Sequence, residues 1–431
     1  MKELNKQLYK EEFLHFVWKY QLYQQQNLKT TTGVPVQILK QGSLNFGQGP
    51  DFSNSRIILG ETEWAGNIEI HKQSSDWYLH HHDEDAGYNN VVLHVVAESD
   101  ALTKTEDGRL IPTIEIGSLI NESILDNYEQ LLQSANWIPC ESNLAGFDFD
   151  QLIGFSERLL IERLEDKSAK IILRLRRNRG DWEECFHQSL AENLGFKTNA
   201  EPMEILARLC PLRILRKYSE HIFQLEALLF GQAGFLIGTA QNPYFAKLQK
   251  EYHYLKKLHH LKSVPLESWK FGKLRPSNFP TVRIAQFAAI LNTKSRVLSR
   301  ILEKPELPKL KAIFSATASP FWDEHFHFNE KSVLTPKKIG IQSINNIIIN
   351  TVSVVVFAYG MHKNEQEYKD YAVELLQQMP AEKNAIVSKY DSLGFNVRNA
   401  IDTQGLLQLK KHHCDEKKCV TCDIGTKILK N

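Results

Sequence analysis

The chain has 431 residues, of which 42% are hydrophobic and 24% are charged. These values are ordinary for globular proteins and exclude a disordered or fibrous chain. The 52 basic and 51 acidic residues give a net charge of +1, so no overall field would draw the protein to nucleic acid or to a membrane. Any surface that binds nucleic acid must therefore be a local patch.

The N-terminus, the apolar stretches and the cysteines favour a cytoplasmic protein that does not contact a membrane. Residues 1–12 carry too many charges for a secretory signal peptide. The apolar stretch at residues 347–359 is shorter than the roughly eighteen residues of a membrane span and fits a buried helix. The six cysteines are too few for a disulfide framework in so long a chain. No pattern indicates the oligomeric state.

The first third of the chain predicts an α/β domain at residues 1–147. An amphipathic helix is expected at residues 10–26 because apolar side chains recur there at helical spacing. Four short segments rich in β-branched residues follow, with Gly60 as a hairpin turn; they are residues 34–39, 55–59, 64–71 and 90–98. A polar helix is expected to begin near Ser74, between the last two. This order predicts a mixed central sheet.

From residue 148 onward the apolar pattern becomes helical, which predicts a mainly α-helical domain at residues 148–410. Helices are expected at residues 152–175, 182–194, 202–218, 222–236 and 243–260. Proline-rich segments at residues 274–280 and 304–308 are expected to join helices. A cysteine-rich tail at residues 411–431 completes the chain.

Asp51 and Glu69 are the candidate ligands of a catalytic metal ion. Phosphodiester hydrolysis needs a metal that activates water and offsets charge on the phosphate, so carboxylates must converge from neighbouring strands. A hairpin through Gly60 would bring the two acids to one face of the sheet. His71 points the same way as Glu69 and could orient the water, bind the metal or contact phosphate. In the competing interpretation, Asp51 is a turn residue, and Glu69 and His71 form an outward polar face.

The histidines downstream of this motif are interpreted as structural. If residues 77–85 are helical, His80 shares a side with Asp83 and Glu84, whereas His82 is offset. A solvated polar helix face explains this composition more simply than a wider metal site. His94 lies in an apolar segment and is interpreted as a hydrogen-bonded core histidine.

The tail predicts a second metal site. Cys419 and Cys422 form a Cys-x-x-Cys motif, and Cys414 supplies a third thiolate. A structural zinc ion takes four nitrogen or sulfur ligands, and the candidates for the fourth are His412, His413 and Cys140. An upstream cysteine that joins a C-terminal trio also resembles the pattern of iron–sulfur nucleases, so an Fe–S cluster is an alternative. Reduced cysteines without a metal are a third interpretation.

A basic cluster immediately before an expected helix is the candidate nucleic-acid surface. Its composition suits contact with phosphates, and its members are Arg174, Arg176, Arg177 and Arg179. In the competing interpretation, these arginines pair with nearby acids on a solvated face.

Several strings of residues together show a resemblance that covers almost the whole chain. They are residues 12–18, 49–52, 64–71, 181–184 and 274–280, and the Cys-x-x-Cys-x-Ile-Gly string that ends at Gly425. The chain resembles a family of bacterial proteins, best represented in Bacteroidetes, that is known as domain of unknown function 2851. This resemblance implies no activity, cofactor or catalytic residue.

The first hundred residues separately resemble the restriction-endonuclease-like (PD-(D/E)xK) nuclease superfamily. In that superfamily a Pro-Asp and a Glu-x-Lys gather two carboxylates and a cation; here Pro50-Asp51 and Glu69-x-His71 stand in their place. Lys72 points to the opposite side of the strand and does not replace the missing lysine. The resemblance implies a restriction-endonuclease-like fold, Mg²⁺ held by Asp51 and Glu69, and DNA or RNA as the substrate.

The sequence thus predicts a metal-dependent nuclease, or a decayed relative of one, that hydrolyses phosphodiester bonds of DNA or RNA. The alternative is a non-catalytic nucleic-acid-binding or assembly protein with structural Zn²⁺ in its tail. A hydrolase that acts on another substrate is a third hypothesis, because a metal, two acids and a histidine do not name a substrate.

Overall fold

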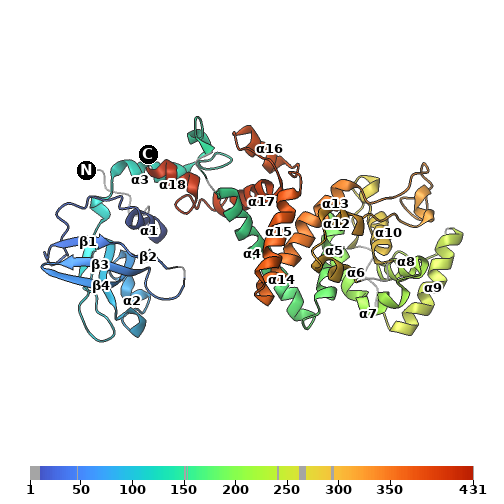
Figure 1. The fold of residues 1–431 in the computed structure, drawn as a ribbon, viewed down its shortest axis with the longest axis horizontal. Coiled ribbons are helices and arrows are strands. Elements are labelled where there is room, and N and C mark those ends of the chain that lie inside the picture. The colour runs from blue at the N-terminus through green and yellow to red at the C-terminus, as the bar shows by residue number, and fades with distance from the viewer. Residues whose placement is uncertain are drawn as a thin grey trace. The chain divides into compact units, whose positions relative to one another are not determined.

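The chain folds into two compact units (Figure 1). The computed structural model describes residues 10–45, 47–149, 152, 154–239, 242–261, 268–292 and 296–430. The first unit comprises residues 1–155 together with residues 409–431, and the second unit comprises residues 156–408. The cysteine-rich tail therefore belongs to the first unit. The charged residues 1–9 on which the expectation about a signal peptide partly rests lie outside the described residues.

The first unit is built around a six-stranded mixed sheet, as the sequence predicts. The strand order is β1-β3-β4-β5-β6, and β2 pairs with β3. The pairs β1–β3 and β3–β4 are antiparallel, whereas β4–β5 and β5–β6 are parallel. The strands are β1 (Val36–Lys40), β2 (Ser43–Leu44), β3 (Phe52–Leu59), β4 (Thr62–Gln73), β5 (Val91–Glu98) and β6 (Thr113–Glu115).

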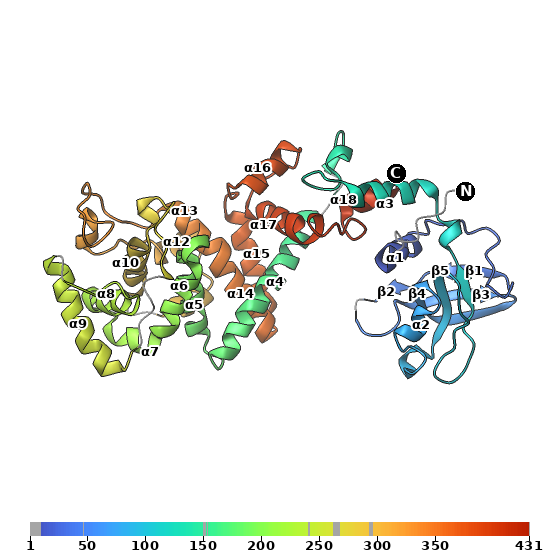
Figure 2. The ribbon, with the colours of Figure 1, turned by 180° about the vertical axis from the view of Figure 1, so that it is seen from behind.

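The helices of the first unit are shorter than the sequence pattern indicates. The helix α1 (Glu11–Lys19) ends well before residue 26, because Gln21 has a left-handed backbone. Only α2 (Asp76–Leu79) is α-helical in the segment after Ser74, which continues with a short 3₁₀ turn, η2 (Ala86–Tyr88). Both α1 and α2 pack against β4 (Figure 2). The remaining elements are η3 (Gly117–Leu119), α3 (Glu122–Gln133), η4 (Glu141–Asn143), the π-helical η11 (Leu409–Cys414) and α18 (Asp423–Lys430).

A close approach of two backbones marks the start of the parallel pairing between β4 and β5. A Cβ atom at Gly66 in β4 would lie 2.5 Å from the carbonyl oxygen of Asn90 and 2.4 Å from a methyl group of Val92. The backbone N–H of Asn67 donates to that same Asn90 carbonyl at 3.0 Å. A glycine is therefore needed here for the two strands to meet in this register.

The second unit is mainly α-helical, as predicted. The N-cap residues Asp181 and Asn242 begin α5 and α9 by accepting hydrogen bonds from backbone N–H groups of the first turn. The helices are α4 (Phe155–Arg177), α5 (Trp182–Leu194), α6 (Phe196–Leu209), α7 (Leu212–Leu215), α8 (Ile222–Gln232), α9 (Pro243–His259), α10 (Pro280–Leu291), α11 (Val297–Leu302), α12 (Leu307–Ile313), α13 (Ile341–Ile347), α14 (Ser353–Lys363), α15 (Gln366–Gln378), α16 (Ala385–Ser392) and α17 (Ala400–Gln408). Shorter turns are η6 (Arg216–Tyr218), η8 (Pro276–Asn278), η9 (Pro320–Glu324) and the π-helical η10 (Ile348–Val352).

The apolar helix around residue 350 is longer than expected. The elements α13, η10 and α14 follow one another without a break over residues 341–363, which is long and apolar enough to cross a membrane. However, 67% of its most apolar window is buried inside the protein, as expected of a core helix.

We expect Gly66→Ala to lower the free energy of unfolding of the first unit by about 1–3 kcal/mol, because the new methyl group must push β5 away. Urea denaturation of the full chain measures the change. The matched control is Gly47→Ala in the same unit, whose Cβ would meet its nearest atom at 3.4 Å. Equal stability of the two variants would contradict the close approach.

Candidate metal centre

Glu69 and His71 are buried on one face of β4. The antiparallel partner β3 and the parallel partner β5 cover both edges of this strand, and the two side chains are 4% and 1% exposed. Being two residues apart, they point to the same side of the sheet. The interpretation of these residues as an outward polar face is therefore wrong.

Asp51 lies beside Glu69, as the sequence pattern predicts. Its backbone N–H donates to Glu69 Oε2 at 3.0 Å. Its own Oδ2 accepts from the backbone N–H of Ile70 at 2.9 Å and lies 3.1 Å from Nε2 of His15 on α1. The two predicted acids thus meet, but the Asp51 carboxylate is held by a backbone amide and by α1.

Three histidines converge next to Glu69. Nε2 of His71 lies 3.1 Å from Nδ1 of His80, and Oε1 of Glu69 lies 3.2 Å from Nε2 of His82 and 3.7 Å from Nε2 of His71. The ligand nitrogens of His71, His80 and His82 all lie within 4.8 Å of one another, which no other group of histidine, cysteine and acidic residues matches in the described part of the chain. Ligands held at about 2.0–2.1 Å by tetrahedral zinc lie roughly 3.3 Å apart. The three imidazoles are therefore spaced to hold a metal ion, with Glu69 beside them.

The segment between β4 and β5 carries two of these ligands. After α2 ends at Leu79, His81 adopts a left-handed backbone with a φ of 59°, and its side chain is 75% exposed. Because of this turn, His80 and His82, which flank His81, both point towards His71. The His82 ring stacks on Tyr88 with 3.9 Å between ring centroids. The expectation of one helical face over residues 77–85 is therefore wrong, because the helix ends at Leu79. The His-x-His spacing of His80 and His82 is the signal in the sequence that would have shown the site.

His94 contacts His71 and holds its ring in place. Its Nε2 lies 2.9 Å from Nδ1 of His71, and its own Nδ1 lies 3.3 Å from the hydroxyl of Thr103. Burial, with neighbouring histidines adding to it, lowers the pKa of His71 to about 2 and that of His94 to about 3, so both rings are neutral. With His71 Nδ1–H donating to His94, the lone pair of His71 Nε2 faces the other ligands. The prediction that His94 is a hydrogen-bonded core residue is confirmed.

The pKa values of Glu69 and His15 are both raised. Burial raises the pKa of Glu69 and the nearby charge of Asp51 adds to this, although the hydrogen bond from His82 opposes it. Burial alone would lower the pKa of His15, but its hydrogen bond with Asp51 and the charge of that acid outweigh burial and raise it. A cation at the centre would therefore stabilise the Glu69 carboxylate, which burial otherwise disfavours in its charged form.

The donor atoms indicate which metal fits. Three imidazoles suit Zn²⁺ and similar transition metals, whereas Mg²⁺ prefers octahedral oxygen ligands. His80 is exposed, while His71 is buried, so the centre is reached from solvent on the side of His80.

The tail brings its cysteines to the upstream Cys140. Lys417 donates to the carbonyl oxygens of Leu132 and Ser134 at the end of α3, and α18 packs on α3. Burial, together with the thiols of Cys422 and Cys419, raises the pKa of Cys140 to about 12. Burial, together with the thiols of Cys422 and Cys414, likewise raises the pKa of Cys419 to about 12. The four thiols thus share one neighbourhood and form no disulfide. The local candidate His413 adjoins Cys414, and His412 lies 3.6 Å from Glu416.

The four arginines of the basic cluster have different environments. Arg174 is buried and pairs with Glu192 at 2.7 Å and Glu204 at 2.9 Å, so it does not face solvent as a phosphate contact would. The other three, Arg176, Arg177 and Arg179, are exposed at the end of α4.

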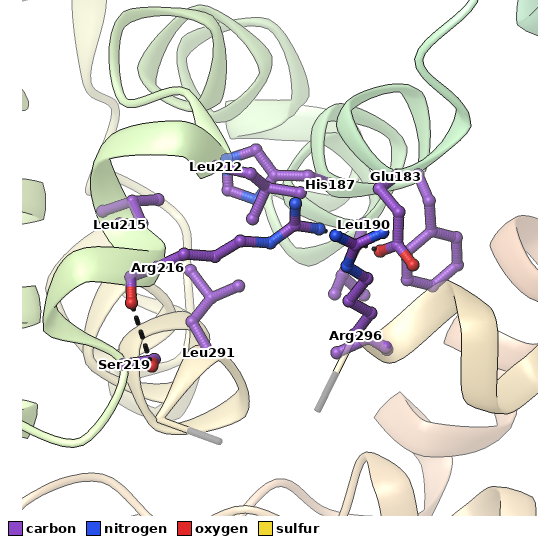
Figure 3. A pocket seen from close by; sticks show the side chains of 11 residues that line it. Glu183, His187, Leu190, Leu212, Leu215, Arg216, Ser219, Leu291 and Arg296 are labelled. Carbon is purple, nitrogen blue, oxygen red and sulfur yellow. Dashed lines mark hydrogen bonds and ion pairs between the residues drawn. The ribbon is translucent and has the colours of Figure 1, made fainter. Parts of the chain in front are cut away.

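A small pocket of about 40 Å³ in the second unit gathers further charged residues. Figure 3 shows the side chains of Arg216 and Arg296 pointing towards Glu183. Arg216 lies 3.4 Å from Glu183, which also accepts hydrogen bonds from Ser299. The charges of this pocket therefore partly neutralise one another.

Comparison with known proteins places the chain in a family and supplies no activity. The family model described as "Protein of unknown function (DUF2851)" matches residues 11–385. No curated protein and no solved structure matches the chain.

We expect His71, His80 and His82 to bind one Zn²⁺ ion, separate from any ion held by the cysteines of the tail. His80→Ala and His82→Ala should each weaken this binding by more than the roughly 10–100-fold that loss of a supporting residue costs. Competition with a fluorescent zinc chelator measures the affinity.

His81→Ala is the matched control, because His81 lies between the two ligands and points to solvent. It should bind zinc as the unaltered chain does. Equal losses in all three variants, or none in any, would contradict the centre.

Proposed function

We propose that this chain, which belongs to the DUF2851 family of proteins of unknown function, is a metal-dependent hydrolase whose active centre is formed by His71, His80, His82 and Glu69. The observation that carries the proposal is the convergence of three imidazoles on a buried glutamate, on a side of the sheet that solvent reaches. A site with three protein ligands and a further open position is typical of catalytic zinc.

The residues around the centre have the properties that hydrolysis needs. A bound zinc ion would lower the pKa of a water molecule and polarise the bond to be broken. Glu69, with its raised pKa, is placed to accept a proton from the attacking water. His15, whose pKa is also raised, is held by Asp51 and would supply positive charge to an anionic substrate.

The order of elements supports phosphodiesters as the substrate class. A helix precedes antiparallel strands, with Asp51 just before β3 and Glu69 in β4, and a crossover then leads to the parallel strand β5. This resembles the core of the restriction-endonuclease-like superfamily, in which two such acids act on DNA or RNA. His71 stands in the position of the usual lysine. The histidines of the crossover replace oxygen ligands with nitrogen, so we propose Zn²⁺ or Mn²⁺ in addition to Mg²⁺ as the metal to test.

We further propose that Arg176, Arg177 and Arg179 contact the backbone of a nucleic acid, because they are exposed and closely spaced. Replacing the three with alanine should weaken DNA or RNA binding measured at fixed salt and leave hydrolysis of a small phosphodiester unchanged. Unchanged nucleic-acid affinity would contradict their role.

We expect the full chain, supplied with Zn²⁺, Mn²⁺ or Mg²⁺, to cleave bis(4-nitrophenyl) phosphate and either DNA or RNA. Glu69→Gln keeps the size of the side chain but removes its basicity, so it should lower the rate by about 10²–10⁴-fold. Release of nitrophenolate and gel analysis of labelled nucleic acid measure the two activities.

The control variant His81→Ala should retain full activity, and a chelator should abolish the activity of both proteins. Metal content is measured on Glu69→Gln to separate lost chemistry from lost metal. Absence of cleavage with all three metals, or equal rates for Glu69→Gln and the unaltered chain, would contradict the proposed hydrolase. The alternative of a non-catalytic binding or assembly protein would then remain.

We also propose that the tail holds a structural Zn²⁺ ion with Cys140, Cys414, Cys419 and Cys422 as ligands. The support is the docking of the tail on α3, which places Cys140 near the other thiols. The close approach of residue 425 to Cys419 needs a glycine, because a Cβ at Gly425 would lie 2.2 Å from the carbonyl oxygen of Cys419.

Cys422→Ser should lower the zinc content by one ion per chain. It should also make residues 409–431 sensitive to protease, because the metal would no longer tie the tail to Cys140. Cys185→Ser is the control, since Cys185 lies in the core of the second unit. Elemental analysis and a visible spectrum decide the metal: an absorbing iron-containing protein would favour the Fe–S alternative, and a metal-free tail would exclude both.

A further inference from the structure

The second unit contains a pocket of about 420 Å³ with a strongly basic lining. This volume falls in the range of small-molecule sites in proteins. The pocket lies between α4, the turn from α5 to α6, and the helix that contains η10. Its cations outnumber its carboxylates, with Glu192 opposed by Lys167, Lys170, Arg174 and Lys197.

Lys167 is a half-buried cation that contacts no carboxylate among the described residues. Its ammonium group donates to Oδ1 of Asn350 at 2.9 Å and to Oε1 of Gln404 at 3.2 Å. Both acceptors are neutral amides, and within the described residues these are its only hydrogen bonds. Burial lowers the pKa of Lys167 to about 7, and the neighbouring charge of Arg163 adds to this, although Glu382 opposes it. A partly buried charge without a counter-ion in direct contact is costly.

The acids near Lys167 are already engaged by other groups. Glu382 is held by the side-chain amides of Asn350 and Gln404, so these amides stand between it and the lysine. Glu192, which also lines the pocket, accepts from Lys170 and Arg174. Glu382 acts on Lys167 only through these amides, so an anion that enters the pocket would be the first group to pair with the ammonium directly.

Two backbone irregularities shape the walls of the pocket around Lys167. Phe196 has a left-handed backbone with a φ of 50°, a costly conformation for a bulky residue that is common at binding sites. Its ring is fixed by the Arg283 guanidinium, 4.5 Å from the ring centre. The π-helical turn η10, a feature frequent at functional sites, presents Asn350 and Thr351 to the pocket. The wall thus offers an aromatic and aliphatic surface beside polar groups.

We propose that this pocket binds a small phosphorylated molecule, with the phosphate on Lys167 and Lys197 and the organic part against Phe196, Ile171 and Val354. Phosphate supplies the counter-ion that Lys167 lacks, and lysine is a common phosphate ligand. The apolar wall selects a ligand with a ring or chain over inorganic phosphate. The site lies wholly in the second unit and does not rest on the proposed hydrolase activity.

Isothermal titration calorimetry of the full chain tests the proposal with AMP, inorganic pyrophosphate and adenosine as probes. AMP should bind with a stoichiometry of one, pyrophosphate more weakly, and adenosine at least tenfold more weakly than AMP. Equal binding of adenosine and AMP, or no binding of either phosphorylated probe, would overturn the proposal.

Lys167→Met and Lys197→Met should each weaken AMP binding at least tenfold. Lys167→Met should also leave the melting temperature of the ligand-free protein unchanged or raise it, because it removes a partly buried charge. A lysine with a purely structural role would destabilise the fold when replaced. Lys197 is exposed, so Lys197→Met tests the site without disturbing the core. The control Lys309→Met, on the exposed side of α12, should bind AMP normally. Unaltered affinity in both pocket variants would overturn the assignment.

Discussion

The parallel pairing of β4 with β5 is the constraint on which the centre of the first unit depends. Parallel neighbours cannot be joined by a tight hairpin, so the chain must cross back over the sheet between them. That crossing carries His80 and His82 over the face on which Glu69 and His71 lie. The register places Glu69 directly beside His94, and the glycine at position 66 allows the two strands to begin their pairing.

Both units keep buried polar groups that the protein alone leaves incompletely compensated. In the first unit, burial lowers the pKa of His71 and raises that of Glu69, so an ionic pair between them is disfavoured and a cation would stabilise the carboxylate. In the second unit, burial lowers the pKa of Lys167, so its positive charge is disfavoured in the same way. Burial of such groups lowers stability, which is why they indicate binding of an ion or ligand better than exposed charges do.

The tail is integral to the first unit although it follows the second in the chain. Lys417 binds carbonyl groups at the end of α3, where the last turn of a helix has unpaired acceptors. Lys430 at the end of the tail lies over the ring of Tyr20, just after α1. The contacts of Lys417, before α18, and of Lys430, at its end, thus fasten the tail to elements that lie far earlier in the sequence.

The sequence by itself determined the mixed sheet, the helical second unit and the meeting of Asp51 with Glu69, because strand alternation, helical periodicity and a hairpin glycine are local signals. It also indicated the burial of His94, which stands among apolar neighbours. Only the tertiary structure decided that His80 and His82 join His71, since this depends on a left-handed residue, His81, and on a crossover whose path is set by strand pairing. Likewise, Arg174 and Arg176 are both arginines in one string, but packing of α4 against its neighbours buries the first in ion pairs and leaves the second exposed. Local pattern fixes which way a side chain leaves its own element, whereas the partner it meets is set by how distant elements pack.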